Sequence, residues 1–199
     1  MTDPSTDAER LVLCFDRDHT VSVNGHPNRA AVPIGWVQYW AHETAIPVWA
    51  TGNQHLKSEA AIPGLAEAEE LWEEDLGNNS YEYSNSEFDY HITPRRRDGL
   101  RLIQDLYEAV FPDETFRFIV VDDVDVSDLA AEGPWAHYFP WDFVAVMEDG
   151  ELERLHGLIE PPDDAYRNEG VPFNSTPDPD FERQQRTVAE IKQHLRNRD

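Results

Sequence analysis

Two aspartates two positions apart, Asp16 and Asp18, follow the first apolar run of this chain. Residues 11–15 (LVLCF) are typical of a short buried strand, and side chains at i and i+2 of an extended chain point to the same side. Two like charges so placed repel each other, so we expect a cation beside them, and Mg²⁺ suits carboxylate oxygens. Because the chain holds 40 Asp and Glu residues, a solvated loop explains this pair equally well when it is taken alone.

A second apolar run, residues 46–50, ends in Thr51, Gly52 and Asn53. The Thr51 hydroxyl can bond a phosphate oxygen, Gly52 lets the backbone come close, and the N–H groups that open a following helix favour an anion. The same three residues are also typical of an ordinary strand-to-helix turn capped by Asn. The segment therefore indicates phosphate binding only in combination with the other segments.

Arg95, Arg96 and Arg97 form a run of three basic residues in a strongly acidic chain. A helical pattern of apolar residues follows within 100–110. A guanidinium ahead of this helix can bind phosphate and keep paired carboxylates ionised. A surface cluster that pairs with nearby acids is the alternative interpretation.

The apolar run 116–121 (FRFIVV) leads directly into Asp122 and Asp123, and Asp125 and Asp128 follow. In α/β proteins, chemistry gathers at the carboxyl ends of strands. Carboxylates and carbonyls are the ligands of a hard divalent ion. These four aspartates therefore offer ligands for such an ion.

Taken together, these segments resemble the haloacid dehalogenase (HAD) superfamily of phosphatases and phosphotransferases. The first motif of that family, D-x-D-x-[TV], matches Asp16, Asp18 and Thr20, and its second, an apolar strand ending in [ST]-G-[ND], matches residues 51–53. All four motifs of the family occur in its order between residues 11 and 128.

The third motif of the family is a single basic residue just ahead of a helix, usually Lys, where this chain has only Arg. Arg97 is the first choice because it lies against the helix start at residues 98–100, and Arg96 is the second. The fourth motif, a strand ending in D-D or G-D-x-x-x-D, matches Asp122 and Asp123 without the Gly, and the resemblance leaves open whether Asp125 or Asp128 assists.

The resemblance implies a Mg²⁺-dependent phosphomonoester hydrolase. Asp16 would attack phosphorus to form an aspartyl-phosphate, and Asp18 would protonate the leaving alcohol and then deprotonate the attacking water. The implied phosphate-binding residues are Thr51, Gly52, Asn53 and Arg97 (or Arg96), and the implied Mg²⁺ ligands are Asp16, Asp18 through its carbonyl, Asp122 and Asp123.

Two alternatives stay open. One is a catalytically silent HAD-like protein that binds a partner through its acidic surface; the pairing of Asp16 with Asp18, which has no evident structural need, argues against it. The other is a phosphotransferase such as a phosphomutase. The intervals 19–50 and 54–96 leave little room for the cap domain with which such enzymes exclude water, which argues against the second.

The expected fold is an α/β, Rossmann-like three-layer fold with a central, mainly parallel sheet and a minimal cap or none. Within 199 residues we expect a polar tail at 1–10, the catalytic domain at 11–160, and a Pro/Asp-rich loop with a terminal helix, 161–199, packed on the same domain. Residues 143–147 (FVAVM) are predicted as a further strand.

Two further segments offer substrate contacts. Residues 19–33 are polar and turn-rich, and in the HAD superfamily a mobile flap leaves the first strand there, so His26 and Arg29 can meet substrate or serve as plain surface residues. The aromatic residues within 135–143 can form a platform for a sugar or base, or simply pack in the core.

Composition limits the partners. The formal net charge is −24, and Lys57 and Lys192 are the only lysines, a pattern familiar from proteins that work in concentrated salt; an acidic surface for a basic partner is the rival explanation. Non-specific nucleic-acid binding is disfavoured, whereas a phosphorylated small molecule or larger phosphorylated partner is expected. The single Cys14 is expected to be buried, and the absence of an apolar span or signal peptide favours a cytoplasmic protein without membrane contact.

Overall fold

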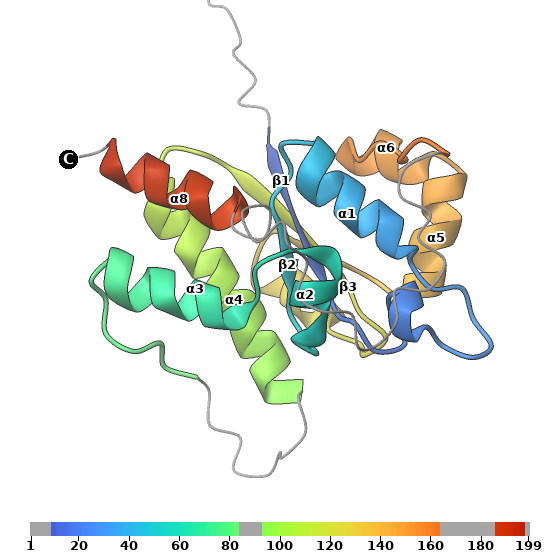
Figure 1. Ribbon diagram of the computed structural model, residues 1–199, viewed down its shortest axis with the longest axis horizontal. Coiled ribbons are helices and arrows are strands. Elements are labelled where there is room, and N and C mark those ends of the chain that lie inside the picture. Colours follow the sequence, from blue (N-terminus) through green and yellow to red (C-terminus); the bar gives the residue numbers. More distant parts are fainter. Residues whose placement is uncertain (1–8, 84–92, 164–185, 198–199) are drawn as a thin grey trace, which may run out of the picture.

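Four parallel strands form the centre of the computed structural model, which describes residues 9–83, 93–163 and 186–197, and the side chains of helix α4 from residue 96 on. Their order across the sheet is β2-β1-β3-β4. Figure 1 shows the sheet edge-on between two layers of helices. The strands are β1 (Arg10–Phe15), β2 (Val48–Ala50), β3 (Phe116–Val121) and β4 (Trp135–Tyr138). The predicted Rossmann-like α/β fold is thus confirmed.

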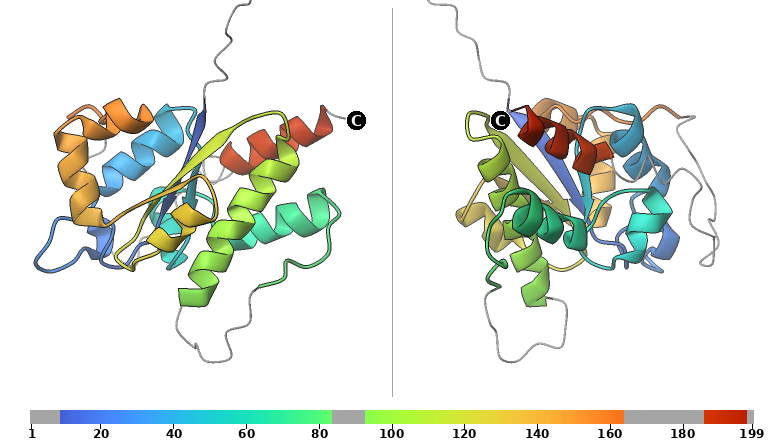
Figure 2. Two further views of the ribbon diagram at one scale, coloured as in Figure 1. Left: turned by 180° about the vertical axis from the view of Figure 1, so that it is seen from behind. Right: turned by 60° about the vertical axis from the view of Figure 1, so that its left-hand side comes forward.

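Helices cover both faces of the sheet, which explains why its central strands are continuous apolar runs. Alternate residues of β1 enter two different cores: Val12 and Cys14 pack on one face, Leu13 and Phe15 on the other. One layer holds α3 (Leu65–Glu70), the π-helix η2 (Leu71–Asp75), α4 (Thr93–Val110) and α8 (Arg186–Arg196); the other holds α1 (Ile34–Glu43), α2 (His55–Ala60), α5 (Pro140–Glu148) and α6 (Glu151–His156). Figure 2 shows the two layers from behind and from the side. Two short 3₁₀ helices, η1 (Ser22–Asn24) and η3 (Ser127–Ala131), lie in loops.

The terminal helix α8 packs against α4 and η2, and its Val188 and Ile191 enter the core on that side of the sheet. The first strand begins at Arg10. The remaining expectations for the tail at 1–8 and for the loop at 164–185 lie outside the described residues. Among the described residues of the two intervals considered for a cap, the helices α1, α2 and α3 pack on the sheet, and no separate cap forms. None of the described helices has the length and apolarity needed to cross a bilayer.

The strand predicted at residues 143–147 is wrong, because these residues lie in helix α5. Pro140 occupies the first turn of the helix, where its missing N–H costs nothing. Phe143 and Met147, four residues apart, are both buried, whereas Ala145 between them is exposed. A strand would have placed all three on one face, and a five-residue apolar run does not distinguish these two patterns.

Substitutions at these positions test whether residues 143–147 form a helix or a strand. Phe143 is fully buried and packs edge-on against Phe15 and Trp40, at centroid distances of 6.0 and 5.8 Å. Phe143→Ala should therefore lower the free energy of unfolding by about 3–5 kcal/mol, whereas Ala145→Lys should change it by no more than about 0.5 kcal/mol. Urea unfolding of both variants measures this. A comparable loss for Ala145→Lys would contradict the helix.

Candidate functional site

The pairing of β1 with β3 brings two aspartates together at the carboxyl edge of the sheet. Phe15 is in register with Val121, so the residues that follow them, Asp16 and Asp122, come side by side. The Asp16 N–H donates to the Val121 carbonyl at 3.1 Å. Both aspartates are buried, with 1% and 0% of their surface exposed. Ligand oxygens of Asp16, Asp122 and the half-buried Asp123 lie within 4.8 Å of one another, an arrangement that could hold a metal ion.

Arg96 is the cation that lies among these carboxylates. One of its terminal nitrogens donates to Asp122 Oδ1, and the other donates to Asp16 Oδ2 at 3.4 Å. Asp123 Oδ1 lies 3.9 Å from the guanidinium. The Arg96 side chain is only 6% exposed, so it neutralises the carboxylates away from bulk water. Arg96, the second choice for the third motif, thus reaches the site.

Arg97, the first choice, lies elsewhere. Its guanidinium pairs with Asp128 at 2.9 Å and with the carbonyl of Asp125 at 3.0 Å on the protein surface. The reason is the helix start: α4 begins at Thr93, so both arginines already follow helical periodicity. Position 96 shares the buried face with Leu100 and Ile103, while position 97 does not. The side chain of Arg95 lies outside the described residues.

Asp125 and Asp128 take no part in the carboxylate group formed by the described residues. Asp125 Oδ1 instead accepts from the Ser127 N–H at 2.9 Å, and Asp128 pairs with Arg97. Both side chains are more than half exposed, at 66% and 52%. Neither is positioned to assist a metal held by Asp16 and Asp122.

The turn after β2 holds Asp16 in place. The Asn53 N–H donates to Asp16 Oδ1 at 3.0 Å. A Cβ atom on Gly52 would lie 1.7 Å from the same oxygen, so only glycine fits there. The Asn53 side chain also accepts from the His55 N–H in an Asx turn, whereas the N-cap of α2 is Gln54, so the alternative of an Asn cap is not what forms. Asn53 thus binds carboxylates rather than standing free for a phosphate.

The pKa of Asp122 is strongly raised. Burial first, and the nearby charge of Asp16 second, raise its pKa from 3.8 to about 8 against the opposing effect of Arg96. Burial also raises the pKa of Asp16, again opposed by Arg96. Asp122 Oδ1 accepts from Arg96 and from the Val124 N–H, whereas its Oδ2 is buried without a partner.

Unpartnered polar atoms gather at this edge of the sheet. Six buried side-chain polar atoms of the described residues lack a hydrogen-bond partner, and four of them belong to Thr20, Thr51, Arg96 and Asp122. Each such atom costs about 1–3 kcal/mol unless something bonds it. When ionised, the three carboxylates also exceed the single charge of Arg96 by two. The free Asp122 oxygen and the negative excess fit a hard divalent cation. The hydroxyls of Thr20 and Thr51 and the Arg96 Nε–H can instead donate to an oxyanion.

Asp18 lies apart from the buried carboxylates and is surrounded by donors. Its Oδ1 accepts from Arg17 at 2.8 Å and from Asn24 at 2.6 Å, and its Oδ2 accepts from the Asn53 amide at 2.8 Å. Partial burial would raise the pKa of Asp18, but the three hydrogen bonds outweigh it and lower that pKa. The ionised form is therefore favoured, which suits a group that accepts a proton.

Sequence reasoning missed the ion pair that positions a hydrogen-bond donor of Asp18. Arg17 is 2% exposed and makes a two-pronged ion pair with Glu59 of α2, with both N–O distances at 2.7 Å. This pair fixes the guanidinium whose third nitrogen reaches Asp18. Arg17 between two aspartates was a visible signal, but no pattern in the sequence links it to a residue 42 positions away.

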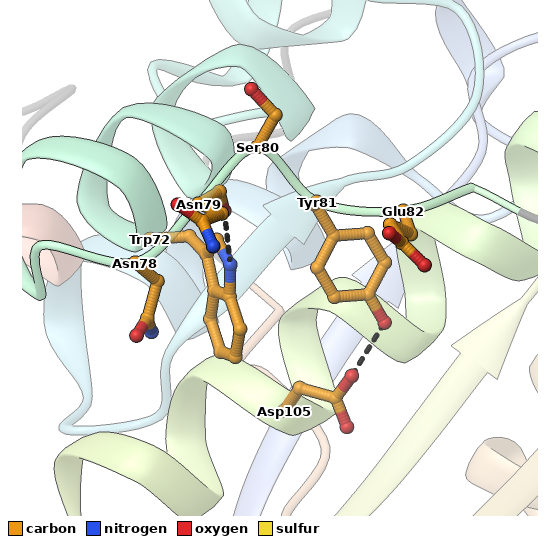
Figure 3. Close-up of a pocket in the computed structure, with 7 residues that line it drawn as sticks. All are labelled: Trp72, Asn78, Asn79, Ser80, Tyr81, Glu82 and Asp105. Atoms are coloured by element: carbon orange, nitrogen blue, oxygen red, sulfur yellow. Dashed lines mark hydrogen bonds between the residues drawn. The ribbon is translucent and has the colours of Figure 1, made fainter.

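A surface hollow of about 470 Å³ lies away from this site, between η2, residues 78–82 and α4 (Figure 3). Its α4 residue, Asp105, is nine positions beyond Arg96, or about 13 Å along a helix. The Tyr81 hydroxyl donates to Asp105, and the Trp72 N–H donates to the carbonyl of Asn79. Because these polar groups already satisfy one another, the hollow does not compete with the carboxylate site as a place for chemistry.

Comparisons with protein-family models, with curated proteins and with solved structures found no match for this chain.

The raised pKa of Asp122 predicts a pH dependence of stability. Between about pH 4 and pH 8, folded Asp122 holds a proton that the unfolded chain releases, so the free energy of unfolding should fall as the pH rises through this window. Asp122→Asn should remove that part of the slope, and comparison with the unchanged chain cancels the general effect of its net charge. Urea unfolding at several pH values without divalent ions measures it. Equal slopes in both proteins would contradict the raised pKa.

Proposed function

We propose that this protein is a Mg²⁺-dependent phosphomonoester hydrolase of the HAD type, which works through a phosphorylated Asp16. One observation carries the proposal: three clustered carboxylates share a buried guanidinium at the carboxyl edge of a parallel sheet, beside four unpartnered polar atoms. This set supports binding of a cation and a phosphoryl group together. Such chemistry depends on positioning and on neutralising charge.

Asp16 is the nucleophile in this proposal. Its two oxygens are fixed by the Asn53 N–H and by Arg96, so the carboxylate is oriented before substrate arrives. Asp16, Asp122 and Asp123 would hold Mg²⁺, which would neutralise charge on the phosphoryl oxygens. The Thr51 hydroxyl is buried, free of partners and able to donate to a phosphoryl oxygen. Arg96 offsets the negative charge that gathers as phosphate and carboxylates come together.

Asp18 is the proton-transfer group. Its hydrogen bonds favour the ionised form, which suits removal of a proton from the water that hydrolyses the phosphorylated Asp16. To protonate a leaving alcohol, Asp18 must first take up a proton, and one of the donors Asn24 and Asn53 must then turn away. We therefore expect good leaving groups, which need no protonation, to react fastest.

The proposal also includes the conditions in which the protein works. The charge of −24 and the two lysines support a cytoplasm with concentrated salt, where ions screen the self-repulsion of the surface. Substrates are phosphorylated small molecules or a larger phosphorylated partner.

A catalytically silent binding protein is the rival. It draws support from Arg96, because a guanidinium between Asp16 and Asp122 partly neutralises them without any metal. A phosphotransferase would share the chemistry at Asp16 and differ in the acceptor that replaces water. Turnover in water, measured below, separates both rivals from the hydrolase.

Substitution of the nucleophile tests the proposal. Asp16→Asn should lower hydrolysis of 4-nitrophenyl phosphate with Mg²⁺ at high salt by about 10⁴-fold or more, because no covalent intermediate can form. Acid-quenched wild-type protein should gain the mass of one phosphoryl group on Asp16. Asp128→Asn, at the exposed Arg97 pair, is the matched control and should keep its turnover. Near-normal turnover of Asp16→Asn would rule out the covalent mechanism.

The two neighbouring arginines form a second matched pair. Arg96→Gln should lower turnover by about 10²–10³-fold, the usual loss when one charge-stabilising donor is removed, and Arg96→Lys should recover part of it. Arg97→Gln removes a surface pair, worth at most about 1 kcal/mol of stability, and should leave turnover intact. Thermal unfolding checks that each variant folds. Equal losses for Arg96→Gln and Arg97→Gln would contradict the assignment of Arg96.

A further inference from the structure

Arg29 lacks the acidic partner that nearly all other described lysines and arginines have. Among the lysines and arginines whose side chains the structure describes, only Arg29 and Arg196 form no ion pair with a carboxylate. In a chain with 40 acidic residues, an exposed arginine without a partner is unusual. Arg196 lies in the last turn of α8, at the far end of the described chain. Arg29 lies in the loop that follows the catalytic strand β1.

Arg29 is held in place by an aromatic ring instead. Its guanidinium carbon lies 4.0 Å from the ring centroid of Trp141, within the range of a cation–π contact. Phe139 stacks parallel to Trp141 at 5.0 Å, and His26 packs against the same ring at 6.3 Å. Stacking fixes the plane of a guanidinium without using its N–H groups, so these donors remain available for an anion.

Contacts connect this arginine to the catalytic edge. Asn24 donates to Asp18, and the His19 N–H donates to the Asn24 carbonyl at 2.8 Å. The His19 ring lies 5.5 Å from that of His26, which in turn meets Trp141. Helix α5 begins directly after β4, the strand beside β3, so the loop after β1 and the start of α5 lie together at the carboxyl edge (Figures 1 and 2). Arg29 and the two histidines thus border the Asp18 side of the site.

His19 adds a second, independent sign of function. Its φ angle is +59°, a left-handed conformation in which a residue other than glycine costs about 1 kcal/mol or more. Its side chain is exposed and immediately follows Asp18. Glycine would adopt this turn without strain, so an imidazole at this position costs stability. Because strained backbone clusters at functional sites, this conformation next to Asp18 supports a role for the His19 side chain there.

We propose that Arg29, flanked by His19 and His26, binds a second anionic group on the leaving-group side of the substrate. The preferred substrates are then phosphomonoesters that carry a further carboxylate or phosphate. Arg96 is engaged by the buried carboxylates, so Arg29 is the described cation at this edge that remains free to attract such a group. This inference rests on the proposed hydrolase function for its catalytic meaning, but the anion site itself can be tested without turnover.

The test compares substrates that differ by one charge. Glycerol 3-phosphate and 3-phosphoglycerate are closely similar except that the second carries a carboxylate, and a sugar bisphosphate supplies a second phosphate. The wild-type protein should prefer the doubly anionic compounds in kcat/KM. Arg29→Gln should lower this preference by about 10- to 100-fold, as expected for a charge-assisted hydrogen bond. Arg196→Gln, the other unpaired arginine, should leave the preference unchanged.

Equilibrium binding separates this inference from the proposed function. Calorimetric titration of the same compounds into the Asp16→Asn protein should show the same dependence on Arg29, at the lowest salt at which the protein stays folded. Trp141→Leu, which removes the stacking platform, should lose part of the preference. If no phosphomonoester is hydrolysed but Arg29-dependent binding persists, the hydrolase fails and the anion site stands. If the compounds with and without the second anionic group bind equally, or if Arg29→Gln weakens both equally, the anion site is wrong.

Discussion

The guanidinium of Arg96 between Asp16 and Asp122 is the interaction on which the rest of the site depends. Both carboxylates end strands in the middle of the sheet, where water does not reach them. Charges so buried are tolerated only when paired, and removing one partner of such a group costs about 3–5 kcal/mol. The pairing of β1 with β3 places the two aspartates side by side, and the buried face of α4 carries Arg96. Sheet and helix therefore have to form together for the site to exist.

The aspartates around Arg96 differ in burial and in pKa. Asp16 and Asp122 are buried and have raised pKa values, so their ionisation responds to whatever cation comes close. Asp18 lies nearer the surface, where three donors keep it ionised. The ion pair of Arg17 with Glu59 of α2 anchors one of those donors. Groups with different proton affinities a few residues apart are what acid–base and nucleophilic steps require.

Much of this arrangement could be predicted from the sequence, because short apolar runs ending in polar residues mark buried parallel strands. The meeting of Asp16 with Asp122 and Asp123 follows from that pattern alone. The choice of arginine failed because it depends on where α4 begins: a start at Thr93 turns Arg96 inward. Residues 143–147 were misassigned because five apolar residues fit either a helix or a strand. The partners of Arg17 and Arg29 come from distant segments, and only the folded chain shows them.

We propose above all that Asp16 accepts a phosphoryl group beside a divalent ion held by the same carboxylates. The most direct measurement is a crystal structure of the protein with Mg²⁺ and beryllium fluoride, which imitates a phosphoryl group bound to a carboxylate. We predict beryllium bonded to an Asp16 oxygen, with Mg²⁺ about 2.0–2.1 Å from oxygens of Asp16 and Asp122. A structure in which Arg96 alone bridges these aspartates under saturating Mg²⁺, with the fluoride complex bound elsewhere or not at all, would contradict the account.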